Sequence, residues 1–78
     1  MPRITDPLEL YAISEERVDN ARRAFDDAKI TLANARAFGT SDHVRLAVES
    51  LEDTAAAYAA NMGTHARLTI DAAKALAR

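Results

Sequence analysis

The sequence predicts an all-α fold, an antiparallel hairpin of two long helices. Only two Gly and two Pro occur in 78 residues, so there are few places where a helix would have to end. Eighteen residues are alanine, which is the strongest helix former. Apolar side chains also recur in seven-residue rows on both sides of Gly39. Rows of this kind indicate helices that pack along a shared seam.

The first helix is expected over residues 7–38. Asp6 is a good N-cap, Pro7 suits the first helical position, and Glu9 stands at the third position of a capping box. Gly39 can adopt the left-handed conformation that ends many helices. The residues before this helix, 1–6, are predicted to form an N-terminal arm, and residues 7–78 a single helical-hairpin domain.

The second helix is expected over residues 42–77, with Ser41 or Asp42 as its N-cap. Gly63 lies in its interior, where glycine costs ~1 kcal/mol relative to alanine. The segment therefore either continues through Gly63 or bends there, with Thr64 as a new N-cap. The apolar pattern keeps its phase on both sides of Gly63, which favours a continuous helix.

In an antiparallel hairpin with a tight turn, residues whose numbers add up to 79 or 80 face one another. Large side chains then oppose small ones, and Ser14 opposes His65 in the one clearly polar layer. Such alternation fills a core densely. A parallel dimer of extended chains would use the same rows, but the turn signal at 39–42 disfavours it. The predicted seam consists of Tyr11, Val18, Ala21, Phe25, Ala28, Leu32 and Ala35 from the first helix and Val44, Val48, Leu51, Ala55, Tyr58 and Met62 from the second.

A hairpin of this size has only a small core of its own, and seven large apolar side chains fall outside the seam. Residues 54–66 also carry no formal charge with His65 neutral, which suits a helix that contacts neighbours on several sides. We therefore predict that the hairpin completes a helical bundle, as a homo-oligomer or with another protein. A solvated alanine face that needs no partner is the alternative. The interface candidates are Leu10, Ile13, Ile30, Phe38, Leu46, Leu68 and Ile70.

Residues suited to catalysis or metal binding do not converge in the sequence. The absence of cysteine excludes disulfides, cysteine-based zinc sites and thiol nucleophiles. His43 and His65 have no carboxylate or histidine three or four residues away, as a metal pair on a helix requires. Carboxylates stand in adjacent pairs such as Asp26 and Asp27, which point about 100° apart on a helix. We expect no catalytic, cofactor or metal site and predict that the protein is not an enzyme.

One basic row, formed by Arg22, Lys29 and Arg36, is the best candidate for contacting phosphates. It supports an alternative function, a small dimeric nucleic-acid-associated regulator. Asp26 stands four residues after Arg22, where it can neutralise the row locally. The formal net charge is -2 and both halves of the chain are equally acidic, which disfavours nucleic acid as a partner.

The remaining expectations concern location and source. No apolar run approaches the ~18 residues of a membrane span, and the first residues lack the pattern of a secretory signal. We therefore expect the protein in the cytoplasm or within a viral particle, without a membrane partner. Arginine outnumbers lysine eight to two and alanine is abundant, which is typical of GC-rich coding sequences. The leading prediction is a non-enzymatic interaction or structural assembly module of a bacterium or phage.

Overall fold

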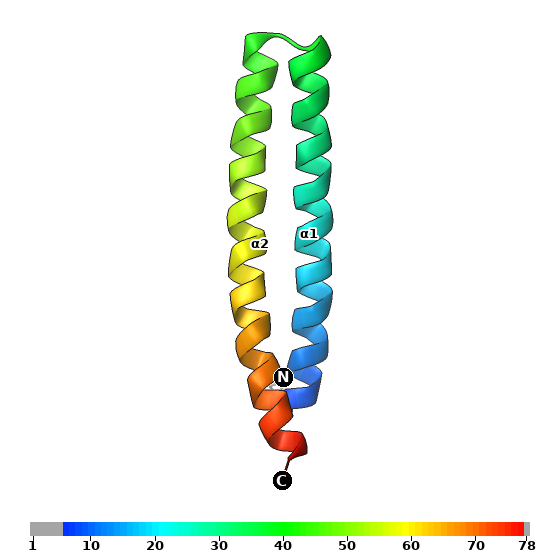
Figure 1. Ribbon diagram of the computed structural model, residues 1–78, viewed down its shortest axis with the longest axis vertical. Coiled ribbons are helices and arrows are strands. Elements are labelled where there is room, and N and C mark those ends of the chain that lie inside the picture. The colour runs from blue at the N-terminus through cyan, green and yellow to red at the C-terminus, as the bar shows by residue number, and fades with distance from the viewer. Residues whose placement is uncertain (1–5, 78) are drawn as a thin grey trace, which may run out of the picture.

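The computed structural model describes residues 6–77, which form two long helices joined by a tight turn (Figure 1). Helix α1 spans Pro7–Phe38 and helix α2 spans Ser41–Leu76. The helices lie side by side and run in opposite directions, so the start of α1 and the end of α2 lie together (Figure 1). The predicted all-α hairpin is thereby confirmed. The predicted arm, apart from Asp6, lies outside the described residues.

Helix α1 has the predicted bounds. Asp6 is its N-cap and accepts a hydrogen bond from the backbone N–H of Leu8 at 3.1 Å. At the other end, Gly39 has an extended backbone with φ -97°, and not the predicted left-handed one. Its N–H donates to the carbonyl oxygen of Ala35 at 2.8 Å. A Cβ on Gly39 would lie 2.7 Å from that oxygen, so the turn needs glycine because of space and not because of a positive φ.

Helix α2 begins one residue earlier than predicted, because Thr40 is its N-cap and not Ser41 or Asp42. The Thr40 hydroxyl oxygen accepts a hydrogen bond from the backbone N–H of His43 at 3.3 Å. In return, the backbone N–H of Thr40 donates to Nδ1 of His43 at 3.4 Å. This is a capping box in which histidine replaces the usual Glu or Gln.

Helix α2 continues through Gly63 as one element, so the chain does not split into a third helix there. A Cβ built on Gly63 would have no neighbour within 4 Å, apart from its own helix backbone. The glycine therefore lies on an open part of the surface. No backbone strain requires it, because none of the described residues has a positive φ.

The hairpin is a single layer of helices. Its dimensions are 57 × 28 × 13 Å, and the smallest is close to the ~10–12 Å diameter of one helix with its side chains. In a molecule of this shape the two helices contact each other along one side, and no third element covers that contact. Among the described residues, only Ser14, Ala28, Ala47 and Ala72 are buried, and no large side chain is fully buried.

Candidate interaction surface

Helix α1 packs against α2 through the residues that the sequence predicts. All seven predicted seam residues of α1 are buried or half-buried, with Ala28 5% exposed. On α2, the half-buried predicted residues are Val44, Leu51, Ala55 and Tyr58. Val48 and Met62, in contrast, are 37% and 43% exposed. The structure therefore differs from the prediction along one row of α2.

That row lies one residue earlier in the sequence. It consists of Ala47, Thr54, Asn61, Leu68 and Ala75, all buried or half-buried. Hydrophobicity favours Val48 and Met62 for the seam, but the structure buries Ala47 there instead. Ala28 of α1 and Ala47 of α2 are 5% and 4% exposed. In the register set by Ser14 and His65 they lie level with Leu51 and Leu32, so each small side chain opposes a large one of the other helix.

The polar members of this row satisfy their hydrogen bonds within their own helix. The Thr54 hydroxyl donates to the carbonyl oxygen of Ser50 at 2.8 Å. The Asn61 side-chain amide donates to the carbonyl oxygen of Ala57 at 2.7 Å. Because these donors are already paired, half-burial of Thr54 and Asn61 carries little desolvation cost.

Ser14 and His65 form the polar layer that the sequence predicts. The Ser14 hydroxyl lies 2.8 Å from Nδ1 of His65 and donates to the carbonyl oxygen of Tyr11 at 2.7 Å. A hydroxyl has one hydrogen, so the two contacts are satisfied together when Nδ1 of His65 carries the ring hydrogen and donates to the Ser14 oxygen. An imidazole that donates to the hydroxyl does not act as its base. This geometry joins the two helices and fixes their register.

The large seam residues lie toward one side of the hairpin. The Tyr11 ring stacks on the His65 ring with 5.2 Å between their centroids. Phe25 and Tyr58 pack at 5.8 Å, and Nζ of Lys29 lies 4.8 Å from the centroid of the Phe25 ring. These contacts join large residues of both helices across the seam.

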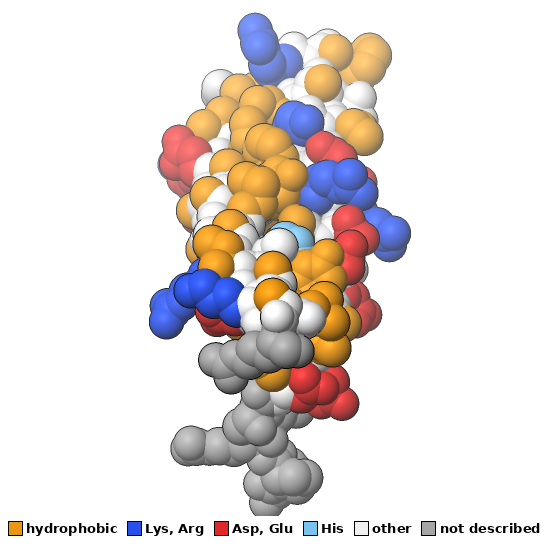
Figure 2. Space-filling model, turned by 60° about the horizontal axis from the view of Figure 1, so that its bottom comes forward, with side chains coloured by type: hydrophobic (Ala, Val, Ile, Leu, Met, Phe, Trp, Pro, Cys, Tyr) orange, Lys and Arg blue, Asp and Glu red, His pale blue; other side chains and the backbone are white. Residues whose placement is uncertain are grey.

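Exposed apolar residues of α2 lie on the same side of the hairpin as these large seam residues. A residue four positions further along a helix is rotated by only ~40°, so Val48 follows Val44 and Met62 follows Tyr58 onto this side. We call it the aromatic face. Hydrophobic side chains form such a stripe along the molecule in Figure 2, with Lys and Arg side chains beside it. The aromatic face consists of Tyr11, Val18, Phe25, Leu32, Val44, Val48, Leu51, Ala55, Tyr58, Met62 and Leu76.

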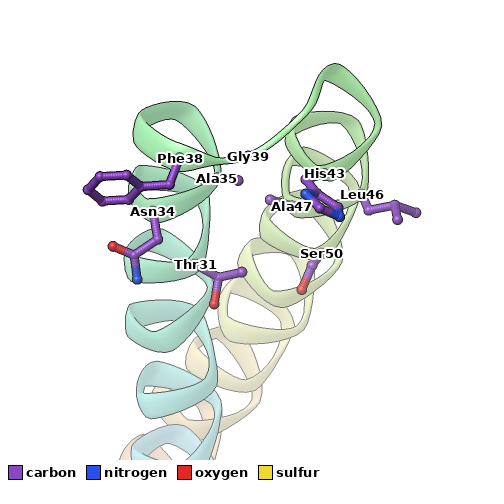
Figure 3. A pocket seen from close by; sticks show the side chains of 9 residues that line it. All are labelled: Thr31, Asn34, Ala35, Phe38, Gly39, His43, Leu46, Ala47 and Ser50. Carbon is purple, nitrogen blue, oxygen red and sulfur yellow. The ribbon is translucent and has the colours of Figure 1, made fainter.

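The opposite side holds two hollows that contain five of the seven interface candidates. Phe38 and Leu46 flank a groove of about 490 Å³ beside the turn, with Ala35 and Ala47 among its lining residues. Their side chains point away from each other (Figure 3), and Phe38 is 91% exposed.

The second hollow lies toward the open end of the hairpin. Leu10, Ile13 and Leu68 line it, and all three are half-buried. The last two candidates, Ile30 and Ile70, are 60% and 56% exposed and line neither hollow. The seven candidates thus do not form one patch.

The basic row is partly neutralised by its neighbours. Arg22 pairs with Asp19 at 3.3 Å and Lys29 pairs with Asp26 at 3.0 Å. Arg22 therefore does not pair with Asp26, as its spacing of four residues predicts, because Asp26 pairs with Lys29. All four side chains are about half exposed, so each pair contributes little stability. Arg36 lies in the last turn of α1, where a cation favours the helix dipole.

Within residues 6–77, no group of three or more His, Asp or Glu side chains is placed to hold a metal ion. Neither described helix is long and apolar enough to cross a membrane. Comparison of the chain with protein-family models, curated proteins and solved structures finds no match.

Proposed function

We propose that this protein is a non-enzymatic interaction or assembly module that associates through an exposed face of its helices, either with itself or with a partner protein. The observation that supports this function is the single-layer shape without a fully buried large side chain among the described residues. Burial of apolar surface is the main stabilising term of a fold. A hairpin that leaves both sides of its seam uncovered obtains only part of that term by itself.

The exposed apolar side chains support the same function. Phe38, Leu46, Met62 and Leu76 are 91%, 55%, 43% and 70% exposed. A single exposed leucine needs no explanation, but several on a one-layer molecule leave apolar surface uncovered on both of its sides, and such surface marks interaction sites. A small assembly component of a bacterium or phage is the setting that the arginine- and alanine-rich composition favours.

The test is whether the chain folds alone. Sedimentation and thermal unfolding are measured on the whole chain over about a hundredfold range of concentration. Self-association predicts a mass above that of one chain and a melting temperature that rises with concentration. Docking on another protein predicts a monomer with weak, non-cooperative unfolding. A monomer that unfolds cooperatively, at a melting temperature independent of concentration, would show that the hairpin needs no partner and would refute the proposal.

A further inference from the structure

We propose that a second copy of this chain covers the aromatic face. The two copies are related by a two-fold axis that crosses the face at the level of Met62, which gives a four-helix bundle with all neighbouring helices antiparallel. This inference rests on the proposed function and names its partner, surface and geometry. Three observations carry it: the accessible area, the apolar pattern of α2 and the charges beside the aromatic face.

The accessible area is larger than that of a compact monomer. The chain exposes 6038 Å² at a mass of 8.5 kDa, whereas a compact monomer of that mass exposes about 4,700 Å². The excess of about 1,300 Å² exceeds the ~800 Å² that each partner contributes to a standard interface. The one-layer hairpin therefore has enough accessible surface to contribute its share of an interface of standard size.

Five large apolar residues of α2 are exposed, and the three that lie on the aromatic face are symmetric about Met62, whereas Leu46 and Ile70 lie on other sides of the helix. Val48 precedes Met62 by fourteen residues and Leu76 follows it by fourteen, and all three are exposed by more than a third. A two-fold axis at Met62 places Val48 of one copy against Leu76 of the other, and Met62 against its own counterpart. A self-complementary patch of this kind is what an isologous interface requires.

The stretch around this axis carries no charge. Residues 54–66 contain neither Asp, Glu, Lys nor Arg. Ala55 is half-buried on the aromatic face, and Ala59 and Ala66 beside it are exposed. Small uncharged side chains allow the two α2 helices to approach closely without desolvating an ion.

The charges on α1 fit the same axis. The bonded pair Ser14 and His65 fixes the register, and this register places Met62 level with residues 17–18 of α1. Glu15 and Arg22 lie on either side of that level, in the row that borders the aromatic face. The two-fold axis therefore brings Glu15 of each copy to Arg22 of the other. Within residues 6–77, the ion pair of Arg22 is an exposed one with Asp19, so its side chain can turn toward a second copy.

The parallel arrangement lacks this match. It would place α1 of one copy over α2 of the other, with the turns at the same end. Glu15 would then lie level with residue 64, inside the uncharged stretch 54–66, which has no cation at that level. The antiparallel arrangement is therefore favoured by charge as well as by the apolar pattern.

Disulfide trapping tests the axis directly, because the chain has no native cysteine. A disulfide requires Cα atoms within about 7 Å. Met62→Cys lies on the axis and is expected to form linked dimers by itself. Val48→Cys and Leu76→Cys are expected to link readily only when the two variants are mixed. Ile70→Cys, 56% exposed on another side of α2, is the control and links slowly.

A second variant pair measures the energetics. Met62→Lys places an unpaired charge in the interface and is expected to raise the dimer dissociation constant about a hundredfold. Ile70→Lys, the matched control, is expected to change it less than about threefold. Met62 is 43% exposed in the hairpin, so its lysine stays hydrated in the separate chain, and helix content at high concentration checks folding.

The outcomes separate this inference from the proposed function. A wild-type dimer in which Met62→Cys links no faster than Ile70→Cys overturns the assigned axis and leaves self-association standing. An unchanged dissociation constant for Met62→Lys overturns it equally. A wild-type chain that is a stable monomer at every concentration overturns both the inference and the function on which it rests.

Discussion

Replacing Ser14 with alanine removes the hydroxyl group that joins the two helices in their polar layer. This hydroxyl forms a hydrogen bond of 2.8 Å with Nδ1 of His65 and donates one to the carbonyl oxygen of Tyr11. Ser14 is only 4% exposed, so water does not replace the lost group. A net hydrogen bond contributes about 1 kcal/mol, the unpaired N–H of His65 adds to the loss, and alanine regains about 0.5 kcal/mol in helix propensity. We expect Ser14→Ala to lower the free energy of unfolding by about 1–2 kcal/mol.

A double-mutant cycle isolates the contact. His65→Leu removes the imidazole, and the double variant Ser14→Ala/His65→Leu turns the layer apolar, so no polar group is left unpaired. We expect the double variant to lose about 1 kcal/mol less than the two single losses together. Urea unfolding followed by circular dichroism, at one fixed protein concentration, measures all three variants. Losses that add within about 0.3 kcal/mol would show that the two residues are not coupled, and would refute this account of the layer.

Three further substitutions test the turn, the helix interior and the close contact, each by urea unfolding against wild type. Gly39→Ala should cost about 1–3 kcal/mol, because the new Cβ would lie 2.7 Å from the carbonyl oxygen of Ala35; an unchanged midpoint would mean that the turn has room. Gly63→Ala should stabilise by up to about 1 kcal/mol, because its Cβ meets open space in a regular helix. A loss of stability at this position would contradict the continuous helix. Ala28→Leu should cost about 1–3 kcal/mol by overfilling a position that is 5% exposed, whereas the exposed control Ala24→Leu should stay within about 0.5 kcal/mol.

A helix end is predictable from the sequence where a single residue at that end is suited to the capping position. Asp6 and Pro7 fix the start of α1, and Gly39 fixes its end. The predicted start of α2 differs from the observed one by a single residue, because Thr40, Ser41 and Asp42 are three consecutive residues that can each serve as an N-cap. The choice among them depends on His43, whose imidazole completes the capping box with Thr40. Histidine is not the usual residue at this position of a capping box, so the sequence does not indicate this role.

The seam was predictable on α1 and only half predictable on α2. Seven-residue rows on α1 alternate large and small, so their packing side is unambiguous. On α2, the row through Val44 and Tyr58 has neighbours on both sides, and hydrophobicity favours Val48 and Met62. In the structure Ala47 lies in the seam instead, 4% exposed. Which of the two neighbouring rows packs against α1 depends on the side chains of both helices, so the pattern of α2 alone does not determine it.

The two-residue connection between the helices also orders the steps of folding. Contacts across the hairpin are nested around the turn, from His43 near Ala35 to Ala75 near Pro7 at the far end. The entropy lost in closing a loop grows with its length, so contacts beside the turn form most readily and the rest can follow one layer after another. Substitutions near His43 should therefore act mainly on the rate of folding, and those near Pro7 on the rate of unfolding. A gradient of amide exchange along each helix, fastest at the open end, is the signature of such a zipper.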